Sequence, residues 1–132
     1  MAKYFTLAEL TRSSTAQAMG VDNTPTPGAV ENLNRLMEQT LDPLREAWGK
    51  PIYVNSGYRS AAVNKAVGGV ATSHHLKGMA ADITTGNSVD NRRLYQLAQD
   101  LMLPFTQLIG KQYAFGWLHI SLDPQNVKRQ PL

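Results

Sequence analysis

The sequence SHHLKGMAAD, residues 73–82, contains the pattern on which the interpretation of this chain depends. His75 offers an imidazole nitrogen and Asp82 a carboxylate oxygen, and both groups are ligands that zinc accepts in proteins. The two residues lie seven positions apart, which is too far for one turn of a helix. Gly78 between them allows the backbone to bend. The stretch therefore predicts a loop over residues 70–78 that leads into a strand over residues 79–83.

A second histidine of interest lies in WLHIS, residues 117–121. Alternate residues of a strand share one face, so Trp117, His119 and Ser121 are expected to point one way and the apolar residues between them toward the core. Together with His75 and Asp82, His119 would complete a set of three ligands. Three protein ligands leave the fourth zinc position open, which is typical of a catalytic zinc site.

Each of these residues also has an ordinary structural interpretation. A single histidine is more often a hydrogen-bonded residue than a metal ligand. We interpret the third histidine, His74, in this way and do not expect it to bind the metal. An aspartate at the end of a strand often caps a turn. One alternative is therefore a domain without metal, in which His75 and Asp82 simply pair.

The longest periodic pattern predicts a helix over about residues 28–48. Thr26 is a suitable N-cap and Pro27 a suitable first residue, while Gly49 is a suitable C-cap. Further helices are expected from Thr6 to about Arg12, over 61–67, and from Asn87 or Ser88 onward, the last with Leu94, Leu97 and Leu101 on its inner face. Further strands are expected over 51–54, 107–109 and 117–122. Residues 13–27 are expected to be mostly loop, and the tail after Asp123 is expected to be loose. These elements predict an α+β fold, with a small antiparallel sheet and packed helices.

Length and composition narrow the classes of protein further. The 132 residues predict a single domain over 1–132, and 42% hydrophobic with 17% charged residues argues against disorder. The net charge of +3 is scattered, so we expect no nucleic-acid partner. The absence of cysteine excludes disulfides, thiolate ligands and a thiol nucleophile. No apolar run approaches 18 residues, so we expect no membrane insertion.

Three motifs together resemble the zinc D-alanyl-D-alanine carboxypeptidase family. The pattern Ser-x-His-x-x-Gly-x-Ala-x-Asp is matched at every position within residues 73–82. A Ser-Gly-Tyr-Arg-Ser segment precedes it at 56–60, and a Trp-x-His-x-Ser strand follows at 117–121. The family includes phage endolysins that cut L-alanyl-D-glutamate bonds, and it shares its fold with the signalling domain of hedgehog proteins. The resemblance implies this hedgehog/DD-peptidase fold for most of the chain.

The resemblance also implies roles for particular residues. It implies that His75, Asp82 and His119 bind zinc and that Arg59 anchors a carboxylate or carbonyl of the substrate, a stem peptide of peptidoglycan. A guanidinium binds carboxylates in a bidentate way, which supports this role. The alternative is that Arg59 pairs with a nearby aspartate or caps the following helix. Tyr58 or Ser73 is expected to hydrogen-bond the substrate or a metal ligand.

The sequence departs from the family where a general base is expected. Relatives carry Glu or Asp three residues before the last histidine, but this position is Gly116, and residues 101–120 contain no acidic residue. His74, Asp90 and Asp123 are the alternative candidates. Otherwise the metal alone activates water, since zinc lowers the pKa of a bound water to about 7, or the domain binds without cutting.

Two hypotheses for the function follow. The first is a zinc peptidase acting on peptidoglycan, of the carboxypeptidase or phage endolysin type, and the second is a catalytically inactive zinc-containing module that binds the cell wall or a protein. The first residues lack the apolar core of a signal peptide, so we expect synthesis in the cytoplasm and action at the wall after release. We expect a monomer.

Overall fold

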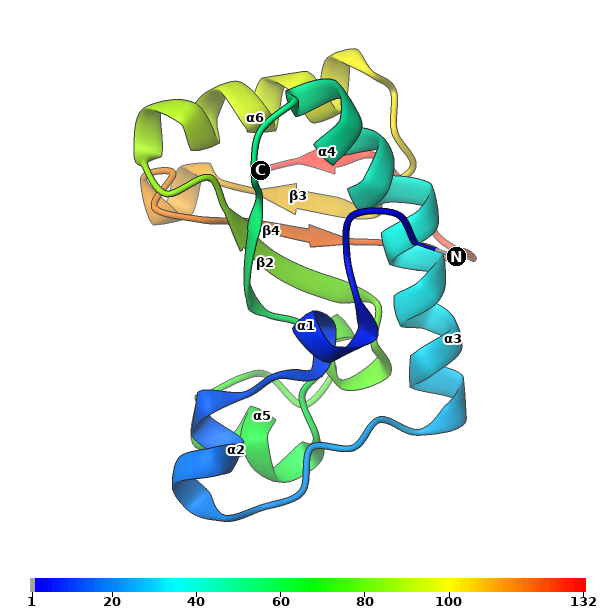
Figure 1. The fold of residues 1–132 in the computed structure, drawn as a ribbon, viewed down its shortest axis with the longest axis vertical. Coiled ribbons are helices and arrows are strands. Elements are labelled where there is room, and N and C mark those ends of the chain that lie inside the picture. The colour runs from blue at the N-terminus through cyan, green and yellow to red at the C-terminus, as the bar shows by residue number, and fades with distance from the viewer. Residues whose placement is uncertain (1) are drawn as a thin grey trace.

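A five-stranded sheet forms the centre of the computed structural model, which describes residues 2–132 (Figure 1). In spatial order the strands are β1 (Tyr53–Ser56), β2 (Ala80–Thr84), β4 (Leu118–Ser121), β3 (Gln107–Ile109) and β5 (Gln130–Pro131). Neighbouring strands are antiparallel from β1 to β3, whereas β5 runs parallel to β3. The α+β prediction is confirmed, and its antiparallel sheet gains one parallel edge strand.

Six α-helices accompany the sheet in the described part of the chain: α1 (Leu7–Thr11), α2 (Ser14–Met19), α3 (Pro27–Leu36), α4 (Asp42–Trp48), α5 (Ala61–Ala66) and α6 (Ser88–Asp100). Two short 3₁₀ helices, η2 (His74–Lys77) and η3 (Lys111–Tyr113), lie in loops next to the sheet. Side-chain caps start most of the α-helices, because a hydroxyl or amide oxygen accepts a backbone N–H that the first turn leaves free. These caps are Thr6, Ser13, Thr26, Ser60 and Asn87.

The helix expected over 28–48 begins and ends as predicted but is interrupted in the middle. Met37–Leu41 forms a π-helical turn, η1, in which the Asp42 N–H donates to the Met37 carbonyl. Pro43 follows immediately; it has no N–H to donate and its ring would clash with the carbonyl four residues earlier. A wider turn at this point removes the conflict without ending the helix.

Two regions expected to be mostly irregular each contain one short ordered element that the sequence did not predict. Residues 14–19 form α2, which Ser13 caps and Gly20 ends in a left-handed conformation. In the tail, the N–H of Leu132 donates to the Leu108 carbonyl at 2.7 Å, which makes β5. The tail covers an edge of β3 whose backbone groups would otherwise lack partners in the sheet. Leu101, expected inside, ends α6 and is 39% exposed.

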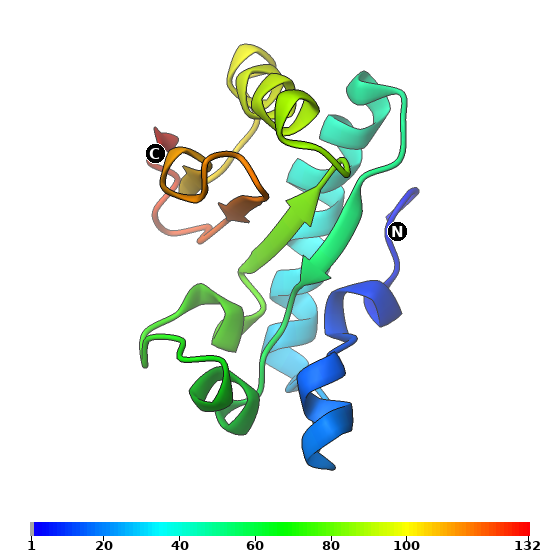
Figure 2. The same cartoon turned by 90° about the vertical axis from the view of Figure 1, so that its left-hand side faces the viewer.

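The two faces of the sheet differ in character. Ala81 and Ile83 of β2, with Leu118 and Ile120 of β4, are buried in the main hydrophobic core. Helices α3 and α4 lie on one side of β1 and β2, whereas the segment 61–78 and the loop 110–117 lie toward the other side (Figure 2). Because side chains alternate along a strand, the residues between the core positions point toward these two loops.

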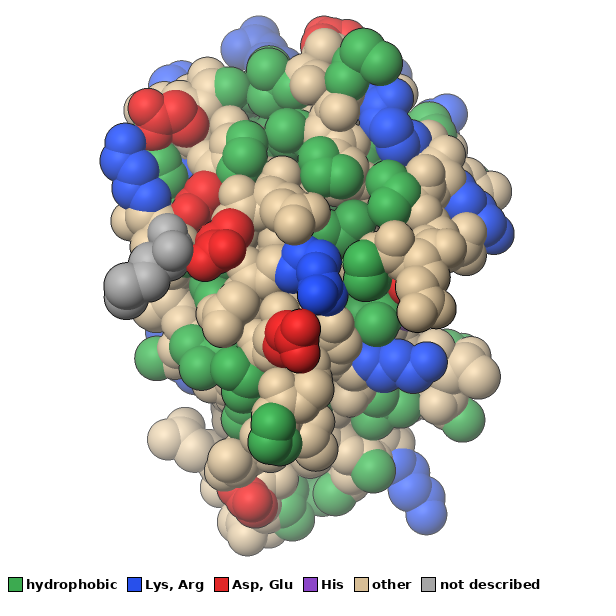
Figure 3. Space-filling view, turned by 90° about the vertical axis from the view of Figure 1, so that its right-hand side faces the viewer, with side chains coloured by type: hydrophobic (Ala, Val, Ile, Leu, Met, Phe, Trp, Pro, Cys, Tyr) green, Lys and Arg blue, Asp and Glu red, His purple; other side chains and the backbone are tan. Residues whose placement is uncertain are grey.

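The surface over α3 and α4 shows no sign of a specialised role. Lysine, arginine and acidic side chains are interspersed with apolar ones on this face, without a large area of one sign (Figure 3). Within residues 2–132, no helix combines the length and apolar character that a membrane crossing requires.

Candidate metal site

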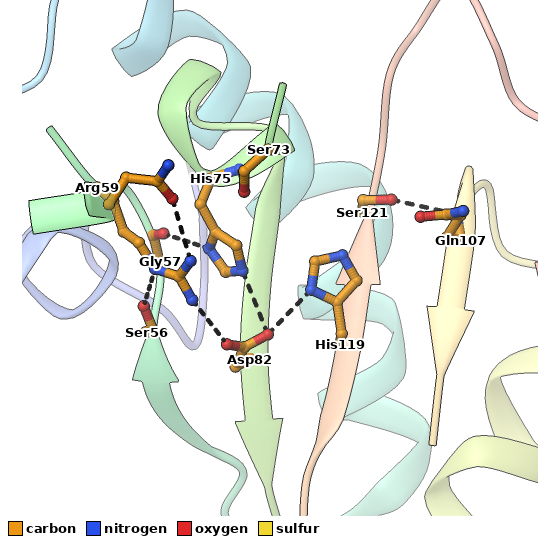
Figure 4. Close-up of polar contacts among 10 residues, drawn as sticks. Ser56, Gly57, Arg59, Ser73, His75, Asp82, Gln107, His119 and Ser121 are labelled. Carbon is orange, nitrogen blue, oxygen red and sulfur yellow. Dashed lines mark hydrogen bonds and ion pairs between the residues drawn. The ribbon is translucent and has the colours of Figure 1, made fainter. Parts of the chain in front are cut away.

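The three predicted ligands meet on the face of the sheet that points away from α3. His75, Asp82 and His119 each offer one ligand atom, and these atoms lie within 4.8 Å of one another. Asp82 Oδ1 is 3.3 Å from His75 Nε2 and 3.0 Å from His119 Nδ1 (Figure 4). Asp82 and His119 are direct cross-strand partners of β2 and β4, so the sheet register brings them together.

A short local structure positions His75. Ser73 caps η2 by accepting the His75 N–H at 3.2 Å, and Gly78 ends it with a φ of 72°. His75 Nδ1 lies 2.6 Å from the Gly57 carbonyl. A carbonyl can only accept, so Nδ1 carries the proton and Nε2 presents its lone pair to Asp82. Metal-ligating histidines are commonly oriented through their second nitrogen in this way.

The donor set fits a divalent metal ion. With its proton on Nδ1, His75 turns a lone pair toward an Asp82 oxygen that also only accepts. Two acceptors that face each other repel, and a cation between them removes the repulsion. Two imidazoles and one carboxylate are a ligand set that suits zinc.

The Asp82 carboxylate is kept ionised by its neighbours. Burial alone would raise its pKa, but a hydrogen bond from His119 and the close approach of the His75 ring outweigh burial and hold the pKa of Asp82 well below its ordinary value. Its second oxygen, Oδ2, lies 3.4 Å from a guanidinium nitrogen of Arg59. A charged, oriented carboxylate is the form in which aspartate binds a metal.

Arg59 is engaged by protein groups at each of its guanidinium nitrogens. Nε donates to Ser56 Oγ at 3.2 Å, Nη1 to Asn64 Oδ1 at 3.3 Å, and Nη2 to Asp82. Its backbone N–H also donates to the His75 carbonyl at 3.0 Å. The geometry thus agrees with the alternative in which Arg59 pairs with an aspartate. Its role as a substrate anchor stays a prediction.

Two of the expected substrate-binding residues shape the site from within. Tyr58 is only 7% exposed and its ring belongs to the hydrophobic core, and a hydrogen bond from it to a substrate stays a prediction. Its neighbour Gly57 supplies the carbonyl that orients His75. Ser73 is half-buried and forms the cap of η2.

The candidate bases separate into two groups. Burial lowers the pKa of His74, the charge of Asp123 opposes this, and His119 lowers it further, so the three side chains influence one another electrostatically. Asp90, in contrast, is at the start of α6, where it binds Asn87 and Arg93. Within residues 2–132, Asp90 therefore does not belong to the group around the metal ligands.

The structure also places a stacked aromatic pair beside the site, of which only Trp117 was expected to share a face with His119. The rings of Tyr113 and Trp117 stack with centroids 4.1 Å apart. Trp117 directly precedes β4, two residues from His119, and is 37% exposed. Burial raises the pKa of Tyr113, and the charge of Asp82 adds to this effect. The four-residue spacing of Tyr113 and Trp117 was the only feature of the sequence that could have predicted their stacking. The stacking also depends on left-handed backbone conformations at Ala114 and Phe115, which the sequence does not indicate.

A buried amide holds this loop in place. Asn91 of α6 is fully buried, and its Nδ2 donates to the carbonyls of Phe115 at 2.8 Å and Gly116 at 3.2 Å. Its Oδ1 accepts the Thr85 N–H at 2.7 Å. One side chain therefore ties the end of β2 to the loop that carries the aromatic pair.

Comparisons with known proteins agree with this geometry. The model of the peptidase M15 family matches residues 3–121. The chain is 38% identical over 111 residues to the zinc D-Ala-D-Ala carboxypeptidase of Streptomyces albus G. That match covers 83% of this chain and 41% of the relative, so the chain spans about two-fifths of the relative's length. The family match takes in all three residues whose ligand atoms converge, and this chain belongs to the peptidase M15 family.

Proposed function

We propose that this chain is a zinc-dependent peptidase that hydrolyses peptide bonds in the stem peptides of bacterial peptidoglycan. The observation that carries the proposal is the close approach of His75, Asp82 and His119, whose ligand atoms lie within 4.8 Å of one another, with His75 Nδ1 held by the Gly57 carbonyl. The name of the Streptomyces relative, a zinc carboxypeptidase for D-Ala-D-Ala, supports both the metal and the substrate class.

Zinc, when bound, supplies Lewis-acid polarisation of a peptide carbonyl and activation of water. The chain's own residues bind and orient. His75, Asp82 and His119 are the ligands, and Arg59 holds the Asp82 carboxylate through its second oxygen. The exposed Trp117, stacked on Tyr113, forms a flat apolar wall beside the site for the substrate.

Proton transfer falls to residues at the edge of the site. We propose His74, with Asp123 near it, as the group that would take a proton from water and return it to the leaving amine. Their support is electrostatic proximity, because Asp123 and His119 both act on the pKa of His74. Since residues 101–120 contain no acidic residue, no carboxylate from β3, β4 or their loop serves this purpose.

The lack of an acidic residue in 101–120 also favours a second candidate function. A module that binds the cell wall or a protein through a structural zinc would need the three ligands but no base. For the enzyme, cleavage of the terminal D-alanine and an endolysin-like cleavage between L-alanine and D-glutamate both use the same ligands. Both the carboxypeptidase and the endopeptidase would act at the cell wall.

Fragment release from purified peptidoglycan, measured by mass spectrometry, tests the proposal. We expect release by the native protein, loss of release on chelation, and recovery when zinc is restored. Loss of one alanine from the stem identifies a carboxypeptidase, whereas release of a stem peptide that begins at D-glutamate, with L-alanine left on the glycan, identifies an endopeptidase. A protein that holds zinc but releases nothing from several wall types would be the binding module instead.

Substitution of Arg59 by lysine is expected to weaken zinc binding by about 10–100-fold, because lysine retains the charge but cannot hold Asp82, Ser56 and Asn64 together. Zinc affinity by chelator competition, with kcat and KM, provides the measurement. Arg35→Lys, at a surface ion pair with Glu31, is the control. A raised KM with unchanged zinc affinity would show that Arg59 anchors substrate rather than orients Asp82.

A further inference from the structure

A second cavity, separate from the metal ligands, lies between α6 and the loop 110–117. Its volume is about 710 Å³, within the range of ligand sites. The residues that line it include Arg92, Arg93, Tyr95, Lys111, Phe115 and Pro131, and we call it the basic groove. None of the three metal ligands lines it.

The basic groove is positively charged. Arg92, Arg93 and Lys111 line it, and no acidic residue is among the described residues that do. Arg93 is paired with Asp90 only at 3.8 Å and is largely exposed, so the pair neutralises it weakly. Arg92 lies over the Phe115 ring, 5.4 Å from its centroid, which leaves its guanidinium edges available.

A largely buried tyrosine also lines the groove. Tyr95 lines the groove and is 6% exposed, and within the described chain its buried hydroxyl has no hydrogen-bond partner. Buried hydroxyls normally form a hydrogen bond, so the absence of a partner for this one is unusual. The ring of Tyr95, rather than its enclosed hydroxyl, is the part that contributes to the groove lining.

The floor of the groove is rigid. Tyr95 packs edge-on against Phe115, with centroids 5.3 Å apart. Phe115 has a left-handed φ of 59°, and Asn91 holds its carbonyl. The cations therefore surround a preformed aromatic surface, which suits a ligand with both oxyanions and aliphatic groups.

The groove and the metal site share one loop. Tyr113 and Trp117 stack beside the metal ligands, whereas Lys111 and Phe115 line the groove. The loop 110–117 lies between α6 and the segment 61–78 that carries His75 (Figure 2). A polymer bound at the metal site can thus reach the groove around this loop.

We propose that the basic groove binds carboxylates of peptidoglycan stem peptides that are not being cut, so that the polymer is held at two places. The inference rests on the proposed peptidoglycan substrate. Arginine binds carboxylates through paired N–H groups, and the aliphatic parts of a stem peptide fit the aromatic floor. The groove therefore distinguishes polymeric peptidoglycan from a short soluble peptide.

The test compares the double variant Arg92→Gln/Lys111→Gln with a matched control, Arg35→Gln/Lys50→Gln, which removes the same charge at two residues that do not line the groove. Binding to insoluble peptidoglycan is measured by sedimentation at fixed salt, without relying on cleavage. The groove variant is expected to bind about tenfold more weakly, as for the loss of charge-assisted contacts. The control variant is expected to stay within about twofold of the native protein, because exposed charges outside a site contribute little.

Two further arms define the ligand. Peptidoglycan whose carboxylates have been amidated is expected to bind the native protein as weakly as the groove variant, and kcat/KM for a short stem peptide is expected to be equal in both. Equal sedimentation of native and groove proteins would overturn the proposal. The proposal would also be overturned if the difference in sedimentation between native and groove proteins disappeared on walls stripped of phosphodiester polymers, because the groove would then recognise phosphate. A native protein that binds through the groove but cuts neither substrate would refute the peptidase instead.

Discussion

Replacement of His119 by alanine is expected to reduce bound zinc from about one ion per chain to a small fraction and to abolish fragment release. The side chain supplies one of only three protein ligands, and its Nδ1 lies 3.0 Å from Asp82. Its loss also removes the hydrogen bond that does most to keep the Asp82 carboxylate ionised against burial. Two ligands alone would not retain zinc through dialysis.

Elemental analysis of dialysed protein measures this effect, and His74→Ala is the matched control. His74 is adjacent to His75 in sequence but is not part of the ligand group, so its variant should keep the zinc whatever happens to turnover. Thermal unfolding of the metal-free forms separates loss of zinc from loss of fold. Full zinc content in His119→Ala would mean that the ligand assignment is wrong.

Substitution of Gly57 by alanine is expected to destabilise the protein by about 3 kcal/mol, as for overpacking against atoms that cannot move. A Cβ at this position would lie 2.2 Å from the Leu10 carbonyl oxygen, which is backbone. That oxygen also accepts the Tyr58 N–H at 2.7 Å, so it cannot yield without breaking the contact between α1 and the turn after β1. Because the Gly57 carbonyl orients His75, zinc affinity should fall as well.

Urea unfolding of the metal-free protein provides the measurement for this variant. Gly28→Ala is the control: it lies in the first turn of α3, and its added Cβ meets nothing within 4 Å. The control should change stability by less than about 1 kcal/mol, with a gain as the expected sign. A Gly57→Ala protein within about 0.5 kcal/mol of the native one would show that α1 adjusts and that the close approach is unimportant.

Local patterns predicted the elements that local interactions determine. Thr26, Pro27 and Gly49 marked the ends of the long helical region because capping involves backbone groups only a few residues away. The alternation in 117–121 placed His119 opposite the core for the same local reason. Helix α2 was missed because its six residues, STAQAM, have little periodicity between a serine cap and a glycine.

The tail shows where local reasoning fails. Gln130 and Pro131 form β5 only because β3, more than 20 positions earlier in the sequence, offers an open edge. Short strands of this kind carry no pattern of their own, since their order comes from the partner strand. The π-helical turn before Pro43 could be anticipated from proline chemistry, but its exact position depends on how η1 packs in the core.

The sequence by itself predicted the fold class and, through its motifs, the three residues that the structure brings together as candidate metal ligands. Residue type, spacing and strand alternation are local properties, which is why they could be read from the sequence. Only the tertiary structure decided the rest of the site. It directed Arg59 to Asp82, put Tyr58 in the core, and placed the Tyr113–Trp117 pair and the basic groove on opposite sides of one loop. Those contacts depend on sheet register, on left-handed residues at 114 and 115, and on the buried amide of Asn91, which join segments that are far apart in the sequence.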